Sequence, residues 1–407
     1  MKLSRLLPAF AVVGVVLTAC GGSTPTTTQS ATVPSDLSIS SFTADFSYMP
    51  KLKDLVGAGK GKVGVILPDT TSSVRYVQFD QPYLQKAFDM AGYKSSDYTI
   101  GNAQGQEAQE LALAQADITN GATVLIMDPL NSTVGSQIQQ LAQSKGVKVI
   151  SYDRATFTGT NTYYVSFDNV QVGELIGKGF VQCVSDWGVK NAQVFELDGG
   201  QNSDPNAVSF AQGYNDAIWG QKQAHVNTGQ TNSQGMTLVN EQVATDWKND
   251  VGQQIFQQQY TAHQNINATV EANDGLGNAV VTVLKSKGVK AKSVPTTGQD
   301  ATPDGMANVL TDYQCGSVYK AVYLEAQAAV ALATVLRASA TPPQALVNST
   351  TSPPANVSGN QQPAVLLVPI WVTKANMKDT VIKDNFVDKA ALCQKVTAAV
   401  CSAAGIS

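Results

Sequence analysis

Short apolar runs separated by amphipathic stretches recur along the chain from residue 62 onward. The first run is residues 63–67 (VGVIL), and residues 123–127 (TVLIM) repeat it. A continuous apolar run of this length is typical of a strand that is buried on both faces of a parallel sheet. The same pattern predicts further strands at residues 147–150, 163–167, 193–197, 268–271, 294–297 and 365–373.

Helical periodicity lies between these predicted strands. Val134, Ile138 and Leu141 are spaced i, i+4 and i+7, and Gly146 stands where a helix commonly stops. Similar patterns predict helices over residues 76–91 and 324–335. Alternating strands and helices predict an α/β architecture with parallel sheets, and the length of 407 residues favours two such sheets.

The first twenty residues form a segment of a different kind. Lys2 and Arg5 precede an apolar run at residues 6–17, which is too short to span a membrane and is flanked like a signal peptide. The sequence Leu-Thr-Ala-Cys that ends at Cys20 resembles the lipobox of bacterial lipoproteins. This resemblance implies a signal peptide at residues 1–20, lipidation of Cys20, and an extracytoplasmic protein anchored to the outer face of the cell membrane by lipid alone. The alternative is an ordinary secretory signal with an incidental cysteine.

Residues 21–60 are predicted to be a tether and an N-terminal extension. Residues 21–34 are mostly Gly, Ser, Thr and Gln with two prolines, a composition that cannot bury enough apolar surface to order itself.

Composition excludes some classes of function. The chain has 27 Lys and Arg against 31 Asp and Glu, a net charge of −4, and it has no long basic run, which argues against nucleic-acid binding. With only two histidines and five cysteines, the chain has few side chains that could form a metal centre. His225 and His263 are predicted to be surface residues, and no metal or cofactor is expected.

Polar side chains follow five of the predicted strands, where ligands of open α/β sheets bind. Carboxylates, amides and guanidinium groups together suit a polyhydroxylated ligand, because each sugar hydroxyl both donates and accepts hydrogen bonds. Tyr76 is a candidate aromatic platform for the apolar face of a sugar ring. The competing interpretation is that these residues are solvated loop residues or helix caps. The residues are Asp69, Arg75, Asp153, Arg154, Asp198, Asn273, Asp274, Gln299 and Asp300.

Five motifs resemble the D-xylose-binding proteins of bacterial ABC importers, in the order of that family. They are VISYDR (149–154), YVSFDN (164–169), GQD (298–300), VYK (318–320) and KDTVIKD (378–384). The resemblance implies a type I periplasmic binding protein fold, in which two α/β lobes joined by three crossovers close over the sugar. It places residues 61–164 and 318–341 in an N-terminal lobe, and residues 165–317 and 342–407 in a C-terminal lobe.

The resemblance also implies the ligand contacts and the partners. A monomer without a cofactor would bind a monosaccharide, most simply D-xylose, and deliver it to an ABC permease and its ATPase. The sequence departs from the family where Val74-Arg75-Tyr76 replaces Glu-Arg-Trp and where Gln242-Val243 replaces Gln-Trp, so one aromatic wall is expected to be absent. The implied contacts are Arg75, Tyr76, Asp153, Arg154, Asn206, Asn273, Asp274, Gln299, Asp300 and Lys320.

Other functions remain as alternatives or are excluded. A sugar receptor that feeds a sensor kinase or a chemotaxis system stays open, as does a different sugar such as glucose or arabinose. The sequence has no G-x-S-x-G motif, and its G-x-G-x-x-G at residues 59–64 precedes a strand instead of following it. A glycosidase would need paired carboxylates such as Asp153 and Asp274, but neighbouring Arg and Lys would lower their pKa values and oppose a general acid.

Four cysteines follow Cys20, an even number that suits disulfides in an exported chain. Of three possible pairings we favour Cys183 with Cys315 and Cys393 with Cys401. In one unbroken helix the Cα atoms of the second pair would be about 12 Å apart, beyond the roughly 7 Å that a disulfide permits. This pairing therefore predicts a bend near residues 394–397.

Overall fold

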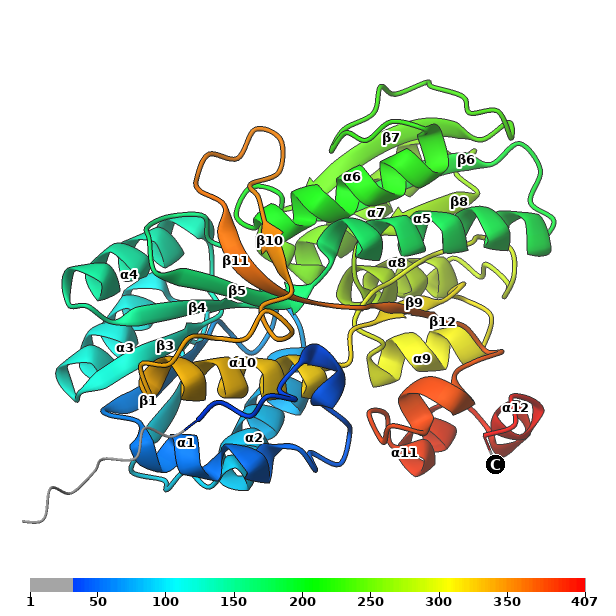
Figure 1. Cartoon of the computed structure of the whole chain (residues 1–407). Coiled ribbons are helices and arrows are strands. Elements are labelled where there is room, and N and C mark those ends of the chain that lie inside the picture. The colour runs from blue at the N-terminus through cyan, green and yellow to red at the C-terminus, as the bar shows by residue number, and fades with distance from the viewer. Residues whose placement is uncertain (1–31, 407) are drawn as a thin grey trace, which may run out of the picture. The chain divides into compact units, whose positions relative to one another are not determined.

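The computed structural model describes residues 32–406, which form an α/β structure with two main sheets (Figure 1). The larger sheet has seven strands in the order β10-β11-β5-β4-β3-β1-β2, and every neighbouring pair is parallel except β10 with β11. Its strands are β1 (Lys62–Leu67), β2 (Tyr98–Asn102), β3 (Ala122–Met127), β4 (Lys148–Tyr152), β5 (Thr162–Phe167), β10 (Ser349–Thr351) and β11 (Gln362–Leu367).

Helices cover both faces of this sheet. Val65 belongs to the core shared with α2 (Gln81–Ala91) and α10 (Val322–Arg337), whereas the next residue, Ile66, belongs to the core shared with α3 (Glu107–Thr119) and α4 (Ser132–Ser144). Successive side chains of a strand point to opposite faces, so a strand covered on both sides must be apolar throughout. This arrangement explains the unbroken apolar run at residues 63–67.

The second sheet has three parallel strands in the order β7-β6-β8, and a separate two-stranded sheet pairs β9 with β12. The strands are β6 (Gln193–Gly199), β7 (Thr237–Ala244), β8 (Ala268–Glu271), β9 (Ser317–Tyr319) and β12 (Ile370–Val372). The helices of this part are α5 (Asn169–Asp186), α6 (Pro205–Trp219), α7 (Asn249–Ala262), α8 (Asp274–Ser286) and α9 (Pro303–Leu310). Short helices complete the described chain: η1 (Ile39–Ser41), η2 (Met49–Leu52), α1 (Lys53–Ala58), η3 (Tyr76–Asp80), η4 (Thr245–Trp247), η5 (Lys378–Ile382), α11 (Lys389–Lys395) and α12 (Ala398–Ala403).

Helices α5 and α6 pack so closely that their contact requires glycine. A Cβ atom on Gly173 would lie 2.0 Å from the carbonyl oxygen of Phe210, and one on Gly213 would lie 2.2 Å from the carbonyl oxygen of Val170. Either substitution would force the two backbones apart. The close contact fixes α6, which carries Asn206 and Phe210 to the candidate site.

Two strand predictions are wrong. Residues 294–297 do not form a strand: the Thr297 hydroxyl accepts a hydrogen bond of 2.8 Å from the Glu271 amide, and the Thr297 amide donates one of 2.7 Å to the Glu271 carboxylate. Only one backbone hydrogen bond, from the Thr269 amide to the Pro295 carbonyl oxygen at 2.9 Å, joins this segment to β8, and side chains make the other contacts. Residues 365–373 form two strands, β11 and β12, which belong to different sheets.

Strand pairing also corrects the predicted division into lobes. Residues 165–167 and 342–407 were assigned to the C-terminal lobe. Instead, β5 extends to Phe167 inside the seven-stranded sheet, and β11 pairs with it in parallel, Val365 opposite Val165. Strand β10 joins the same sheet at its edge.

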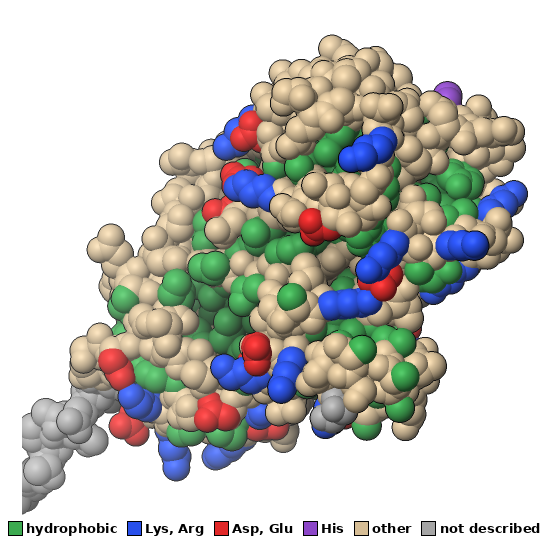
Figure 2. Space-filling model, turned by 90° about the vertical axis from the view of Figure 1, so that its right-hand side faces the viewer, with side chains coloured by type: hydrophobic (Ala, Val, Ile, Leu, Met, Phe, Trp, Pro, Cys, Tyr) green, Lys and Arg blue, Asp and Glu red, His purple; other side chains and the backbone are tan. Residues whose placement is uncertain are grey.

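The predicted N-terminal extension packs against the first lobe. Leu37, Phe46, Met49 and Leu52 are fully buried in the core that contains α2 and α10. The predicted signal peptide, Cys20 and the predicted tether up to residue 31 lie outside the described residues. Within residues 32–406, no helix is long and apolar enough to cross a membrane. Lys and Arg side chains are interspersed with Asp and Glu over the face shown in Figure 2.

The structure contains the two disulfides that the sequence analysis favours. Cys183 is bonded to Cys315 with a Cα–Cα distance of 5.8 Å, and Cys393 is bonded to Cys401 with a distance of 5.7 Å. Val396, between α11 and α12, leaves the helical conformation with φ −108° and ψ −109°. The break brings the second pair of cysteines within reach.

Candidate functional site

A cavity lies beyond the carboxyl ends of strands from both main sheets. Nine of the ten sequence-predicted contacts line it; Asp274 does not. The lining residues are Ser72, Ser73, Arg75, Tyr76, Asp153, Arg154, Asp204, Asn206, Phe210, Trp247, Asn273, Gln299, Asp300 and Lys320.

Asp153 and Lys320 form the charged centre of the cavity wall. Asp153 Oδ1 accepts hydrogen bonds from Lys320 Nζ at 3.0 Å and from Arg75 Nη1 at 2.7 Å. Burial alone would raise the pKa of Asp153, but the charges of Arg75 and Lys320 outweigh it and hold that pKa well below its usual range. Burial would likewise lower the pKa of Lys320, but Asp153 raises it. Both side chains are therefore charged at neutral pH.

The guanidinium group of Arg75 is hydrogen-bonded to three carboxylates of the protein. Besides Asp153, it donates to both oxygens of Asp80 at 2.8 and 2.7 Å and to Glu325 at 2.9 Å. Asp80 directly precedes α2, and Glu325 is in α10. Arg75 therefore fixes the loop after β1 against both helices and leaves little of its guanidinium for a ligand.

Arg154 joins loops that come from different strands. Its Nη1 donates to the carbonyl oxygen of Leu130 at 3.1 Å, and its Nη2 donates to the Tyr76 hydroxyl at 2.9 Å. Its Nε lies 3.7 Å from Asp204, which caps α6 beside the second sheet. Asn206 makes a similar connection, because its side-chain amide donates a hydrogen bond of 2.7 Å to the carbonyl oxygen of Asp153. These contacts link the ends of the two sheets across the cavity.

Three aromatic side chains form the apolar wall. Tyr76 was predicted, whereas Phe210 and Trp247 were not. The rings of Phe210 and Trp247 lie 6.2 Å apart at 64°. Trp247 fits because Gly199 and Gly200 carry no side chain: a Cβ on either would meet its indole at 2.0 or 2.2 Å.

The aromatic wall expected to be absent at residue 243 is therefore supplied by Trp247, four residues later. In the sequence, the glycine pair that ends β6 and the tryptophan soon after β7 could have indicated this aromatic wall. Phe210 could also have been identified, because it lies one helical turn after Asn206 on the same face of α6.

Several polar atoms of the lining remain without a protein partner. Asn273 Oδ1 caps α8 by accepting from the Leu276 amide at 2.9 Å, which leaves its amide nitrogen available. Gln299 Oε1 is buried and has no hydrogen-bond partner among the described residues. The same holds for Asp300 Oδ1, which lies 3.8 Å from Lys320 Nζ in an ion pair. Buried polar groups of this kind call for a partner, so these atoms are candidates for ligand contacts.

Asp274 lies behind the cavity wall, in contrast to the sequence-based expectation. Its carboxylate accepts hydrogen bonds from the Thr302 amide and hydroxyl at 2.7 and 3.0 Å, from Gln314 at 2.9 Å, and from Ser317 at 2.8 Å. Burial raises its pKa to about 7. It therefore holds residues 302–317 against α8 and does not face Asp153 across the cavity as a glycosidase pair would.

The lining as a whole carries no net formal charge. Its three basic side chains, Arg75, Arg154 and Lys320, are balanced by three acidic ones, Asp153, Asp204 and Asp300. Such a surface offers charge-assisted hydrogen bonds to a ligand that is itself uncharged.

The architecture and this enclosed cavity at the strand ends are those of a two-lobed solute-binding protein. Residues 63–339 match the model of the periplasmic binding protein domain family. The chain belongs to that family and has the type I periplasmic binding protein fold.

Individual relatives agree with this assignment. The D-xylose-binding periplasmic protein of Escherichia coli (strain K12) is 30% identical over 330 residues, which cover 80% of this chain and 90% of that protein. The protein of the same name from Haemophilus influenzae is 29% identical over 344 residues, covering 84% and 93%. A carbohydrate transporter solute-binding protein from Chloroflexus aurantiacus, solved in complex with D-glucose, has a TM-score of 0.67 at 23% identity and covers 81% of this chain and 97% of that chain.

Proposed function

We propose that this protein is an extracytoplasmic, lipid-anchored binding protein that captures one monosaccharide, D-xylose, and delivers it to an ABC importer. The observation that carries the proposal is the pairing, in one cavity, of a charge-balanced polar wall with an aromatic wall. Hydroxyl groups of a sugar can bind between the Asp153–Lys320 pair and the unpartnered atoms of Asn273 and Gln299. The C–H face of the ring can cover Phe210 and Trp247.

The origin of the lining residues supports a single sugar ring. An oligosaccharide would need an open groove, whereas this lining comes from loops of both main sheets. Two relatives are named for D-xylose, which favours a pentose over a hexose.

Closure of the two lobes supplies the mechanism. Asp153 and Arg154 follow β4 of the seven-stranded sheet, while Asn206, Trp247 and Asn273 lie in segments that follow strands of the second sheet. Neither set alone surrounds a ligand, so binding selects the closed arrangement, which a permease can distinguish from the open one. In this proposal the protein works as a monomer, residues 61–164 form the body of the N-terminal lobe, and Lys320 lies at a crossover.

A thermal-shift panel of monosaccharides tests the ligand. A sugar present at 100 times its Kd should stabilise the protein by roughly 2.7 kcal/mol. D-xylose should give the largest shift, followed by D-glucose or L-arabinose.

Uptake of labelled D-xylose by cells that lack the protein separates import from signalling. Loss of uptake supports the importer. Normal uptake together with loss of a transcriptional or chemotactic response would instead indicate the receptor function.

A further inference from the structure

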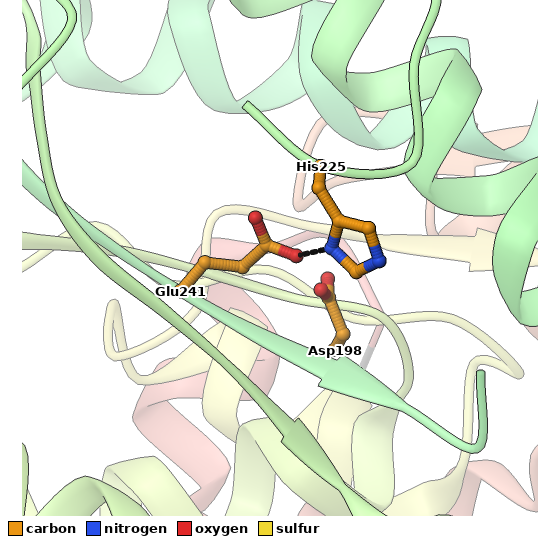
Figure 3. A group of neighbouring side chains, drawn as sticks. All are labelled: Asp198, His225 and Glu241. Carbon is orange, nitrogen blue, oxygen red and sulfur yellow. Dashed lines mark hydrogen bonds and ion pairs between the residues drawn. The ribbon is translucent and has the colours of Figure 1, made fainter. Parts of the chain in front are cut away.

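A second cluster of ligating side chains lies outside the sugar cavity. Asp198 at the end of β6, Glu241 in β7 and His225 in the segment between α6 and β7 come together (Figure 3). One ligand atom from each lies within 4.8 Å of the other two, and His225 Nδ1 is 2.5 Å from Glu241 Oε1. None of the three lines the sugar cavity.

The carboxylate of Asp198 is aimed into this cluster and is only partly satisfied. The residue is 1% exposed, and one of its oxygens accepts a hydrogen bond from the Tyr214 hydroxyl. The other oxygen, Oδ2, is buried and has no partner among the described residues. An isolated buried carboxylate oxygen is costly, and a bound cation is one of the groups that remove the cost.

The surroundings are acidic. Glu196 shares a face of β6 with Asp198, and its Oε2 is also buried and unpartnered within the described part of the chain. Among the ion pairs of residues 32–406, none joins a Lys or Arg to Glu196, Asp198 or Glu241. A divalent cation would neutralise this negative region.

We propose that Asp198, His225 and Glu241 bind a divalent transition-metal ion of the Zn²⁺ type, with water as the fourth ligand. One imidazole nitrogen and two carboxylates form a donor set that zinc accepts, whereas Ca²⁺ and Mg²⁺ require six or more oxygen ligands. Ligand atoms of a tetrahedral zinc site lie about 3.3 Å apart, given bonds near 2.0 Å. The present ligand atoms lie within 4.8 Å of one another, and the His225 side chain is 65% exposed, which leaves it space to turn toward an ion.

The site would connect the segment between α6 and β7 to the sheet. A ligand that binds only the folded chain stabilises it by mass action, so zinc should raise the unfolding temperature. Because the ion would bind away from the sugar cavity, this effect is independent of the proposed sugar function.

The test uses the full chain, purified without a histidine tag and dialysed against a chelator. Titration with ZnCl₂, followed by calorimetry and thermal unfolding, should show one ion per chain and a raised unfolding temperature. His225→Ala and Glu241→Gln should each weaken zinc binding at least tenfold. His263→Ala is the matched control, because it removes the other histidine of the chain and should leave zinc binding unchanged.

Circular dichroism shows whether each variant is folded. The proposal is overturned if the wild type binds no zinc, or if folded His225→Ala binds zinc as well as the wild type does. It is also overturned if Ca²⁺ or Mg²⁺ stabilises the protein as much as Zn²⁺. None of these outcomes depends on whether the protein binds D-xylose.

Discussion

Asp153, which directly follows β4, is bonded at 3.0 Å to Lys320, which directly follows β9, so one ion pair joins the ends of strands from two different sheets. Asp153 also adopts a left-handed backbone conformation with φ 56°, which turns the chain sharply at the strand end. Arg75 holds the same carboxylate from a third loop. The charged wall is therefore oriented by the protein itself, which lowers the cost of ordering it around a ligand.

Replacing Asn273 by Ser tests the unpartnered polar atoms. Serine keeps the helix cap on α8 but removes the amide group that faces the cavity. We expect D-xylose affinity to fall by roughly threefold to tenfold, the effect of one neutral hydrogen bond, with little change in stability. Asn131→Ser is the control, because Asn131 caps α4 in the same way but does not line the cavity. An equal loss of affinity in both variants would argue against a ligand contact at Asn273.

Trp247 should report binding by its fluorescence. It is one of four tryptophans in the chain, and its indole lines the cavity next to Phe210. Addition of D-xylose should change the intrinsic emission of the wild type. Trp187→Phe is the control and should keep this change, because Trp187 follows the last residue of α5 and does not line the cavity. Trp247→Phe should lose the change. A signal that persists in Trp247→Phe would place the sugar elsewhere.

Stability should fall as the pH rises from about 5 to 8. Burial raises the pKa of Glu110 and of Glu271 from 4.5 to about 8. Between these values the folded chain keeps a proton that the unfolded chain releases, so raising the pH favours unfolding, by on the order of 1 kcal/mol per pH unit for each group. Glu271→Gln keeps an acceptor for the Thr297 amide and should flatten the dependence measured by urea unfolding. An unchanged slope in that variant would show that Glu271 does not titrate in this range.

Membrane attachment should depend on Cys20. Acyl chains on that residue, rather than a helix, would hold the protein, so Cys20→Ser should move it from the membrane fraction to the soluble fraction. Fractionation in high salt checks this. A Cys20→Ser variant that stays with the membrane would rule out the lipid anchor.

Apolar strands could be predicted from the sequence, whereas the polar edge strands β2, β7 and β10 could not. Strands β1 and β3 are covered on both faces, so their burial appears as a continuous apolar run. Strands β2 and β7 lie at the ends of their sheets and contain the polar sequences YTIGN and TLVNEQVA, which resemble loops. The pairing of β11 with β5 joins segments about two hundred residues apart, and no local pattern encodes it.

The site could likewise be predicted only where its residues have a local sequence pattern. Strand ends identified the polar lining because ligands of parallel sheets bind there. Asp274 has the same local setting, yet its four hydrogen bonds come from residues 302–317, so its structural role depends on tertiary contacts. Trp247 reaches the cavity only because the glycine pair that ends β6 leaves room for its indole.

The assignment of the cavity as a monosaccharide site is decided by calorimetric titration of the wild-type protein with D-xylose, with D-glucose and L-arabinose titrated in parallel. We expect one site per chain, saturable binding of D-xylose, and weaker binding of the other two sugars. If none of the three sugars binds, the assignment is contradicted.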